Sequence, residues 1–122
     1  MTDYREQIDK ALLAHGAWKQ QLNAAIGTSA SQFTVAQLRA DNLCEFGKWF
    51  HSLPPDVQSA QIPASIKKLH AEFHLEASKI LDLALKGRKD QALEALGQGQ
   101  AYNKLSGQLM LAMRQWENTL AD

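Results

Sequence analysis

The chain has 122 residues, with 13 basic and 13 acidic side chains and a formal net charge of zero. This length suits one domain, and the balanced charge gives no support to nucleic-acid binding or to attachment to an anionic membrane. No apolar run approaches the roughly 20 residues of a membrane span, and the polar first residues are not typical of a signal peptide. The single cysteine cannot form an internal disulfide. We therefore expect a soluble, cytoplasmic protein that binds no nucleic acid and no membrane.

The first long segment has the spacing of an amphipathic helix, because apolar side chains recur at steps of three and four residues. It ends at Gly27, where a small polar stretch follows. The inward side of this predicted helix carries Ile8, Leu12, His15, Trp18 or Lys19, Leu22 and Ile26.

A second helical region is predicted to begin directly after Thr34. Thr34 and Gln37 have the spacing of a capping box, and Phe33 and Leu38 are placed to form a hydrophobic staple. The region has a predicted break near residues 41–42 and ends at a pair of prolines. Its apolar part is expected to be a helix that carries Leu43, Cys44, Phe46, Gly47, Trp49 and Phe50.

Two further helices complete the predicted fold. One begins near Pro63 and ends at Lys86, where Gly87 follows as the C′ glycine. The other begins at Asp90, its N-cap, and runs almost to the last residue, with glycines that predict a kink or a close helix contact. The inward side chains are Ile66, Leu69 or His70, Phe73, Ala77, Ile80 and Ala84 in the first, and Leu93, Leu96, Leu105, Leu109, Ala112 or Met113, Trp116 and Leu120 in the second. Short connections favour antiparallel neighbours, so we predict an all-α, antiparallel four-helix bundle.

Four side chains in these segments form a candidate metal site. His70 and His74 stand four residues apart, so both imidazoles project from the same face of one helix. They are half of a tetrahedral zinc site, which His15 and Cys44 would complete from two other segments. One buried zinc ion would then join three helices. Taken singly, a histidine near an apolar stripe is more often a hydrogen-bonded core residue, and a lone cysteine is more often a small buried hydrophobe.

Three segments around these residues resemble the chemoreceptor zinc-binding (CZB) family. They are His-Gly-Ala-Trp at residues 15–18, Cys-Glu-Phe-Gly-Lys-Trp at 44–49, which is the most specific, and His-Ala-Glu-Phe-His at 70–74. The resemblance extends over nearly the whole chain and implies one domain over residues 1–122. It implies a zinc-binding bundle that acts as a cytoplasmic regulatory module in bacterial chemotaxis receptors, diguanylate cyclases and some small proteins. The family's ligands map onto His15, Cys44, His70 and His74, and its usual pairing predicts a homodimer.

The chemistry of the proposed ligands makes Cys44 the redox-sensitive member, since oxidants attack thiolates and not zinc or imidazole. His51 lies seven residues after Cys44, about two helical turns away, which is too far for the same zinc. Trp18 and Trp49 are expected to pack around the site. Three carboxylates could orient an imidazole N–H, although such groups are more often solvated: Asp41, Glu45 and Glu72.

The sequence thus predicts a zinc-binding sensory or regulatory module of bacterial signalling, in chemotaxis or cyclic-di-GMP pathways. It would respond to zinc availability, to oxidation of Cys44, or to both, and nothing in the chain identifies the output protein or domain. One alternative is a metal-stabilised helical interaction protein without a sensing role. Another is a zinc hydrolase, but Ala71 stands where an H-E-x-x-H motif needs its glutamate, and four protein ligands leave no position for a water. We therefore expect no enzymatic activity.

Overall fold

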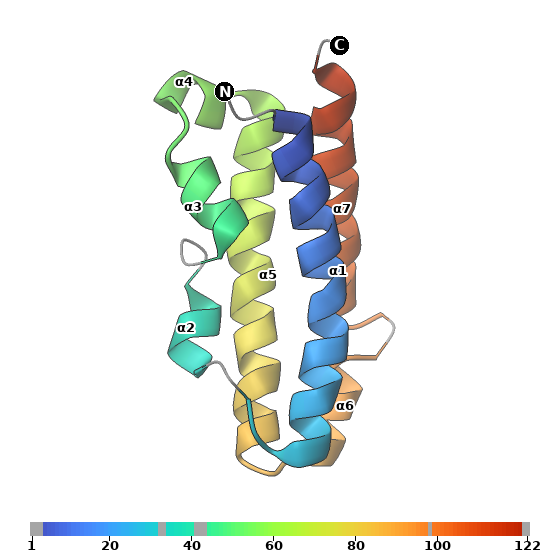
Figure 1. Ribbon diagram of the computed structural model, residues 1–122. Helices are drawn as coiled ribbons and strands as arrows, with labels where there is room; N and C mark the ends of the chain where they lie inside the picture. Colours follow the sequence, from blue (N-terminus) through green and yellow to red (C-terminus); the bar gives the residue numbers. More distant parts are fainter. Residues whose placement is uncertain (1–3, 32–33, 41–43, 98, 121–122) are drawn as a thin grey trace.

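A computed structural model describes residues 4–31, 34–40, 44–97 and 99–120. Every regular element in these ranges is a helix, which confirms the predicted all-α class. Three long helices stand alongside one another, and shorter helices flank them (Figure 1). In chain order the helices are α1 (Tyr4–Thr28), α2 (Val35–Arg39), α3 (Glu45–His51), α4 (Pro55–Gln58), α5 (Gln61–Leu85), α6 (Lys89–Ala95) and α7 (Ala101–Thr119).

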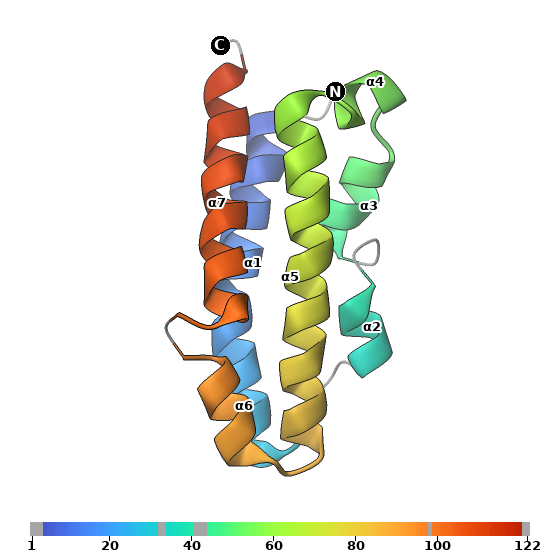
Figure 2. The same cartoon turned by 180° about the vertical axis from the view of Figure 1, so that it is seen from behind.

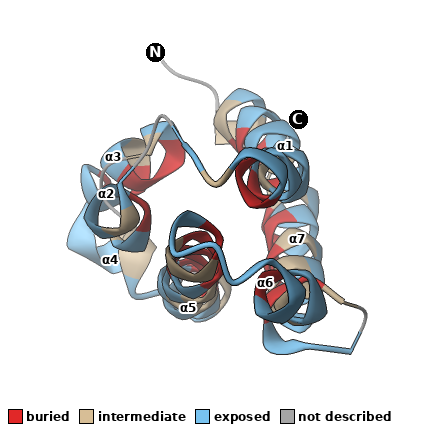
Figure 3. Cartoon of the chain, turned by 90° about the horizontal axis from the view of Figure 1, so that it is seen from below, coloured by how far each residue is buried: buried red, intermediate tan, exposed pale blue. Residues whose placement is uncertain are grey.

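The helices form the four columns of a bundle. The helix α1 is the first column, α2, α3 and α4 follow one another as the second, α5 is the third, and α6 continues into α7 as the fourth (Figures 1 and 2). Successive columns run in opposite directions, and buried residues face the interior between them (Figure 3). The predicted antiparallel four-helix bundle is therefore confirmed. Within the described segments, no helix combines the length and hydrophobicity that a membrane crossing requires.

The two longest helices bury the faces that their sequence periodicity predicts. In α1, Leu12 and Trp18 are only half-buried and Lys19 is exposed, whereas the other four positions of the predicted stripe are buried. In α5, every position of the predicted stripe from Ile66 to Ala84 is buried except Leu69, the alternative to His70. Three- and four-residue steps keep these side chains on one face, so each helix can seal one side of the core.

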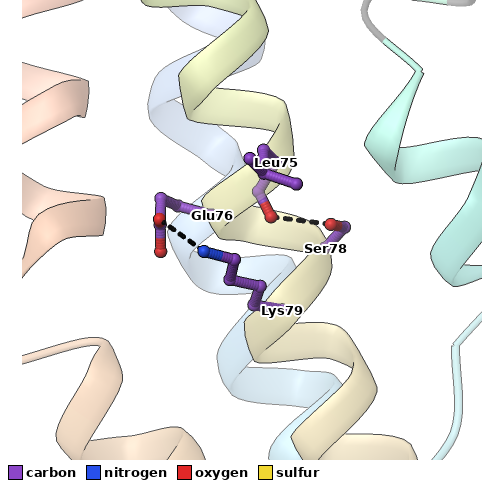
Figure 4. Close-up of polar contacts among 4 residues, drawn as sticks. All are labelled: Leu75, Glu76, Ser78 and Lys79. Carbon is purple, nitrogen blue, oxygen red and sulfur yellow. Dashed lines mark hydrogen bonds and ion pairs between the residues drawn. The ribbon is translucent and has the colours of Figure 1, made fainter.

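A buried serine interrupts the apolar face of α5 without leaving a polar group unsatisfied. Ser78 Oγ donates to the carbonyl oxygen of Leu75 at 2.6 Å (Figure 4). Nearby, Lys79 Nζ and Glu76 Oε1 form an ion pair at 3.0 Å. Since the hydroxyl bonds within its own helix, α5 can pack at this level against apolar neighbours.

The second column differs in part from the prediction. The capping box is present: Gln37 N donates to Thr34 Oγ1, and Thr34 N donates to Gln37 Oε1, both at 3.0 Å. Phe33 of the predicted staple and the predicted break at 41–42 lie outside the described residues. Placing Cys44 inside a helix was wrong, because Cys44 has extended backbone angles and is the N-cap of α3. The short helix α4 was not predicted, and α5 begins at Gln61, two residues before Pro63.

The fourth column is not one helix, which corrects another prediction. The helix is interrupted between α6 and α7. In this connection Gly99 has a φ of +84°, a value that residues with a side chain rarely adopt. Asn103 Nδ2 donates to the carbonyl oxygen of Gly97 at 2.9 Å and so helps to satisfy the end of α6. Asp90 is not the N-cap, since Arg88 holds that position, and Leu93 is 52% exposed instead of facing inward. Gly87 has the left-handed conformation of the predicted C′ glycine.

The different burial of two leucines in α7 predicts that their substitutions differ in their effect on stability. Leu109 is fully buried, whereas Leu111 is 59% exposed. We expect Leu109→Ala to lower the free energy of unfolding by about 2–5 kcal/mol, because lost burial and a cavity both contribute. Leu111→Ala should stay within about 0.5 kcal/mol of the wild type. Urea unfolding of the two variants checks this, and similar midpoints would contradict the described packing.

Candidate metal centre

The structure brings together all four side chains that the sequence singled out. His15 comes from α1, Cys44 from the N-cap of α3, and His70 and His74 from α5. One ring nitrogen of each histidine and the sulfur of Cys44 lie within 4.8 Å of one another. Residues from three columns of the bundle therefore converge on one point.

The site is buried on its histidine side and more open on its cysteine side. His15, His70 and His74 are 3%, 3% and 2% exposed, whereas Cys44 is only half-buried. Phe46 of α3 meets the ring of His70 edge-on at 5.1 Å between centroids. The imidazoles thus sit among aromatic side chains, which keep water away from their nitrogens.

Hydrogen bonds to the backbone fix the tautomers of two imidazoles. His15 Nδ1 lies 2.8 Å from the carbonyl oxygen of Ala11, and His74 Nδ1 lies 2.8 Å from that of Leu38. A carbonyl only accepts, so each Nδ1 must carry the proton and donate it. In a neutral imidazole the other nitrogen, Nε2, then presents a lone pair. Both of these lone pairs are available toward the centre of the site.

The central nitrogen of His70 shows why this arrangement suits a cation. His70 Nε2 lies 3.1 Å from His15 Nε2 and 3.1 Å from His74 Nε2. If His70 Nε2 carries a proton, its one N–H can point at only one of these two acceptors, and if it carries none, neither contact has a hydrogen between the nitrogens. At least one of the two close N–N contacts is therefore not a hydrogen bond, and a metal ion shared by the three nitrogens would make both of them favourable.

The spacing of the donor atoms fits zinc. Zinc–nitrogen and zinc–sulfur bonds of about 2.05 and 2.3 Å place tetrahedral ligands roughly 3.3 Å (N to N) and 3.6 Å (N to S) apart. The observed separations are 3.1 Å between neighbouring imidazole nitrogens and 3.4 Å from Cys44 Sγ to His70 Nε2. Three imidazoles and one thiolate are also a donor set that zinc favours. The other separations among the four donor atoms are at most 4.8 Å, so side-chain shifts of about an ångström would let these residues hold the metal.

Burial keeps the imidazoles of His15 and His70 neutral, the form in which imidazole binds a metal. It lowers the pKa of His15 from 6.5 to about 4, an effect that the hydrogen bond to Ala11 partly opposes. Burial also lowers the pKa of His70 to about 2, with further lowering by the neighbouring charges of His74 and His15. At neutral pH these two rings are therefore not imidazolium ions, so metal binding has no positive charge on them to overcome.

Cys44 has a structural role besides its place among the donors. Its sulfur accepts a hydrogen bond from the backbone N–H of Gly47 at 3.3 Å, which caps the first turn of α3. The carbonyl oxygen of Cys44 accepts from Lys48 N at 2.9 Å and continues the helical pattern. The start of α3 and the donor cluster therefore share one sulfur atom.

The groups that orient the imidazoles are backbone carbonyls, which the sequence analysis missed. Of the three carboxylates considered, Glu45 is exposed, Glu72 is half-buried, and Asp41 lies outside the described residues. No carboxylate joins the donor cluster among the residues that the structure describes. His51 is exposed at the end of α3 and is not part of the cluster. Trp49 packs on Phe46 at 5.8 Å, as expected of a residue that surrounds the site.

The two depressed pKa values predict how the metal-free protein responds to acid. Unfolding restores each histidine to a pKa near 6.5, so below that pH the unfolded chain binds protons that the folded chain does not. Stability is therefore fully present above pH 6.5 and falls as the pH drops toward 4, by about 1.4 kcal/mol per pH unit for each histidine. Urea unfolding in the presence of a chelator at pH 7.5, 6.0 and 5.0 measures this slope. His51→Ala should preserve the slope, His15→Phe should reduce it, and a flat profile would contradict the prediction.

One of three comparisons with known proteins found a match, and that match includes the donor cluster. The other two found no curated protein and no solved structure that matches the chain. The family model of the chemoreceptor zinc-binding domain (CZB) matches residues 15–81, a stretch that contains all four converging side chains. Members of this family are zinc-binding signalling modules of bacteria. Because the match covers more than half of its length, this chain belongs to the chemoreceptor zinc-binding domain family.

Proposed function

We propose that residues 1–122 form a single cytoplasmic regulatory domain that holds one zinc ion through His15, Cys44, His70 and His74. The observation that carries this proposal is the convergence of four donor atoms from three columns within 4.8 Å. The orientation of His15 and His74 by backbone carbonyls supports it further. Four protein ligands leave no open position for a reactive water, so we propose no catalytic role.

We further propose that Cys44 is the responsive ligand. When bound, zinc keeps the sulfur as a thiolate and ties α1, α3 and α5 together. With hydrogen peroxide as oxidant, the thiolate sulfur attacks one peroxide oxygen, an S–O bond forms, the O–O bond breaks and hydroxide leaves; an organic hydroperoxide reacts in the same way and releases an alkoxide. The sulfur loses two electrons, which reduce the peroxide. The product is a neutral sulfenic acid, a much weaker zinc ligand than the thiolate.

Ring contacts of α3 connect the segment that begins at Cys44 with the other columns of the bundle. Phe46 contacts His70, and Trp49 contacts Tyr4 at 5.2 Å and Trp116 at 5.8 Å between ring centroids. Tyr4 begins α1 and Trp116 lies near the end of α7, at the same end of the bundle (Figure 1). Movement of α3 after loss of the sulfur–zinc bond would therefore disturb the packing of that end.

The biological setting that we propose follows the family. The module would act in bacterial chemotaxis or cyclic-di-GMP signalling, paired as a homodimer, and pass its state to an output protein or domain. A metal-stabilised interaction protein without a sensing role is the competing function. The two differ in whether oxidation of Cys44 changes zinc occupancy.

A titration with hydrogen peroxide or hypochlorite tests the proposal. Zinc release is followed with a colorimetric chelator, and the mass of the Cys44 peptide reports oxidation. We expect release in step with sulfenic acid formation, and recovery after an external thiol is added, since the chain has no second cysteine to resolve the product. Zinc that stays bound while Cys44 oxidises, or that leaves while Cys44 stays reduced, would refute the thiolate switch.

A further inference from the structure

A small pocket lies directly beside the cysteine side of the donor cluster, between α1 and α3. His15 and Cys44 are among the residues that line it, and its volume is about 120 Å³. Cys44 is also the one member of the cluster that is not fully buried. Cys44 is therefore the most exposed of the four residues, and it borders this pocket, whereas the three histidines are buried.

The lining of the pocket restricts what can enter. Most of it is apolar, and its polar members include Gln7 and the exposed, oppositely charged Lys10 and Glu45. Two charges of opposite sign give no strong preference for either an anion or a cation. Since a protein cavity of about 150 Å³ binds benzene, a pocket of about 120 Å³ has room for a molecule slightly smaller than benzene. The apolar lining residues are Ala11, Ala14, Trp18 and Phe46.

We propose that this pocket is a size-selective access site through which small, uncharged oxidants such as hydrogen peroxide reach Cys44 while the bundle stays folded. This inference rests on the proposed role of Cys44 as the responsive ligand. The pocket holds the oxidant next to Sγ, and the reaction there is the balanced attack of sulfur on peroxide given above. Bulky oxidants of the same chemistry are excluded by the walls and react only when the site opens.

Ala14 offers a direct way to fill the pocket. It is exposed on α1 and lines the pocket, so Ala14→Leu adds three carbon atoms at the opening and keeps a good helix former. Ala17 is also exposed on α1 but does not line the pocket, so Ala17→Leu is the matched control. The zinc-loaded proteins are treated with hydrogen peroxide or with the bulky, uncharged cumene hydroperoxide. Mass spectrometry gives the rate of Cys44 oxidation, divided by the rate for the urea-unfolded protein.

We expect hydrogen peroxide to oxidise wild-type Cys44 at least tenfold faster than cumene hydroperoxide after this normalisation. Ala14→Leu should slow the hydrogen peroxide reaction about tenfold at unchanged zinc content, and Ala17→Leu should leave it unchanged. Equal normalised rates for the two peroxides in the wild type would overturn the proposal, even if Ala14→Leu failed to fold. A wild-type rate in folded, zinc-loaded Ala14→Leu would overturn it as well. Because the readout is oxidation and not zinc release, zinc retained after oxidation refutes the switch alone and leaves the access site standing.

Discussion

Replacing His70 or His74 with alanine is expected to weaken zinc binding by about 100-fold or more. A structural zinc site contributes roughly 10–16 kcal/mol through four ligands, so the loss of one ligand costs at least a few kcal/mol. His70 has the largest expected effect, because its Nε2 lies within 3.4 Å of three other donor atoms. Metal analysis after dialysis against a competing chelator measures the change.

His51→Ala is the control for these variants. His51 is a histidine of the same chain, but it is exposed and lies outside the donor cluster. Its substitution should leave about one zinc per chain. Equal losses of zinc from His51→Ala and His74→Ala would refute the assignment of the ligands.

Removing zinc from the wild type is expected to lower the melting temperature by roughly 10–20 °C while most helicity remains. At a free zinc concentration 1,000 times Kd, binding adds about 4 kcal/mol to the stability of a chain of this size. The helices keep an apolar core without the metal, since Ile8, Ile66 and Phe73 are fully buried. Thermal melting followed by circular dichroism, with and without chelator, measures both quantities.

Two outcomes would contradict this prediction. A random-coil spectrum after zinc removal would mean that the core cannot fold without the metal. An unchanged melting curve would mean that zinc does not bind the folded state in preference to the unfolded chain. Addition of zinc to the stripped protein should restore the original melting temperature.

The parts of the fold that the sequence predicted well are those governed by periodicity. The helices α1 and α5 have long runs of three- and four-residue steps, so their buried faces follow from helix geometry alone. The pairing of His70 with His74 follows for the same reason. The break between α6 and α7 could not be located in this way, because a glycine in a helical pattern is tolerated in some places and ends the helix in others.

The site, too, was predicted only in part. The residue types at His15, Cys44 and His70 indicated a metal, but two features of their surroundings could not be predicted from the sequence. Cysteine is not among the usual N-cap residues, so nothing predicted that Cys44 begins α3. Every residue has a carbonyl group, so the carbonyls of Ala11 and Leu38 could be identified as imidazole partners only once the helices were placed.

The wide separation of the four donors along the chain has a consequence for the kinetics of folding. His15 and His70 are 55 residues apart, and Cys44 and His70 are 26 apart, so the donor atoms meet only after α1, α3 and α5 have docked. Contacts that form late lie beyond the transition state and affect the unfolding rate more than the folding rate. Zinc should therefore prolong the lifetime of the folded chain, and its loss should shorten that lifetime while the rate of refolding hardly changes.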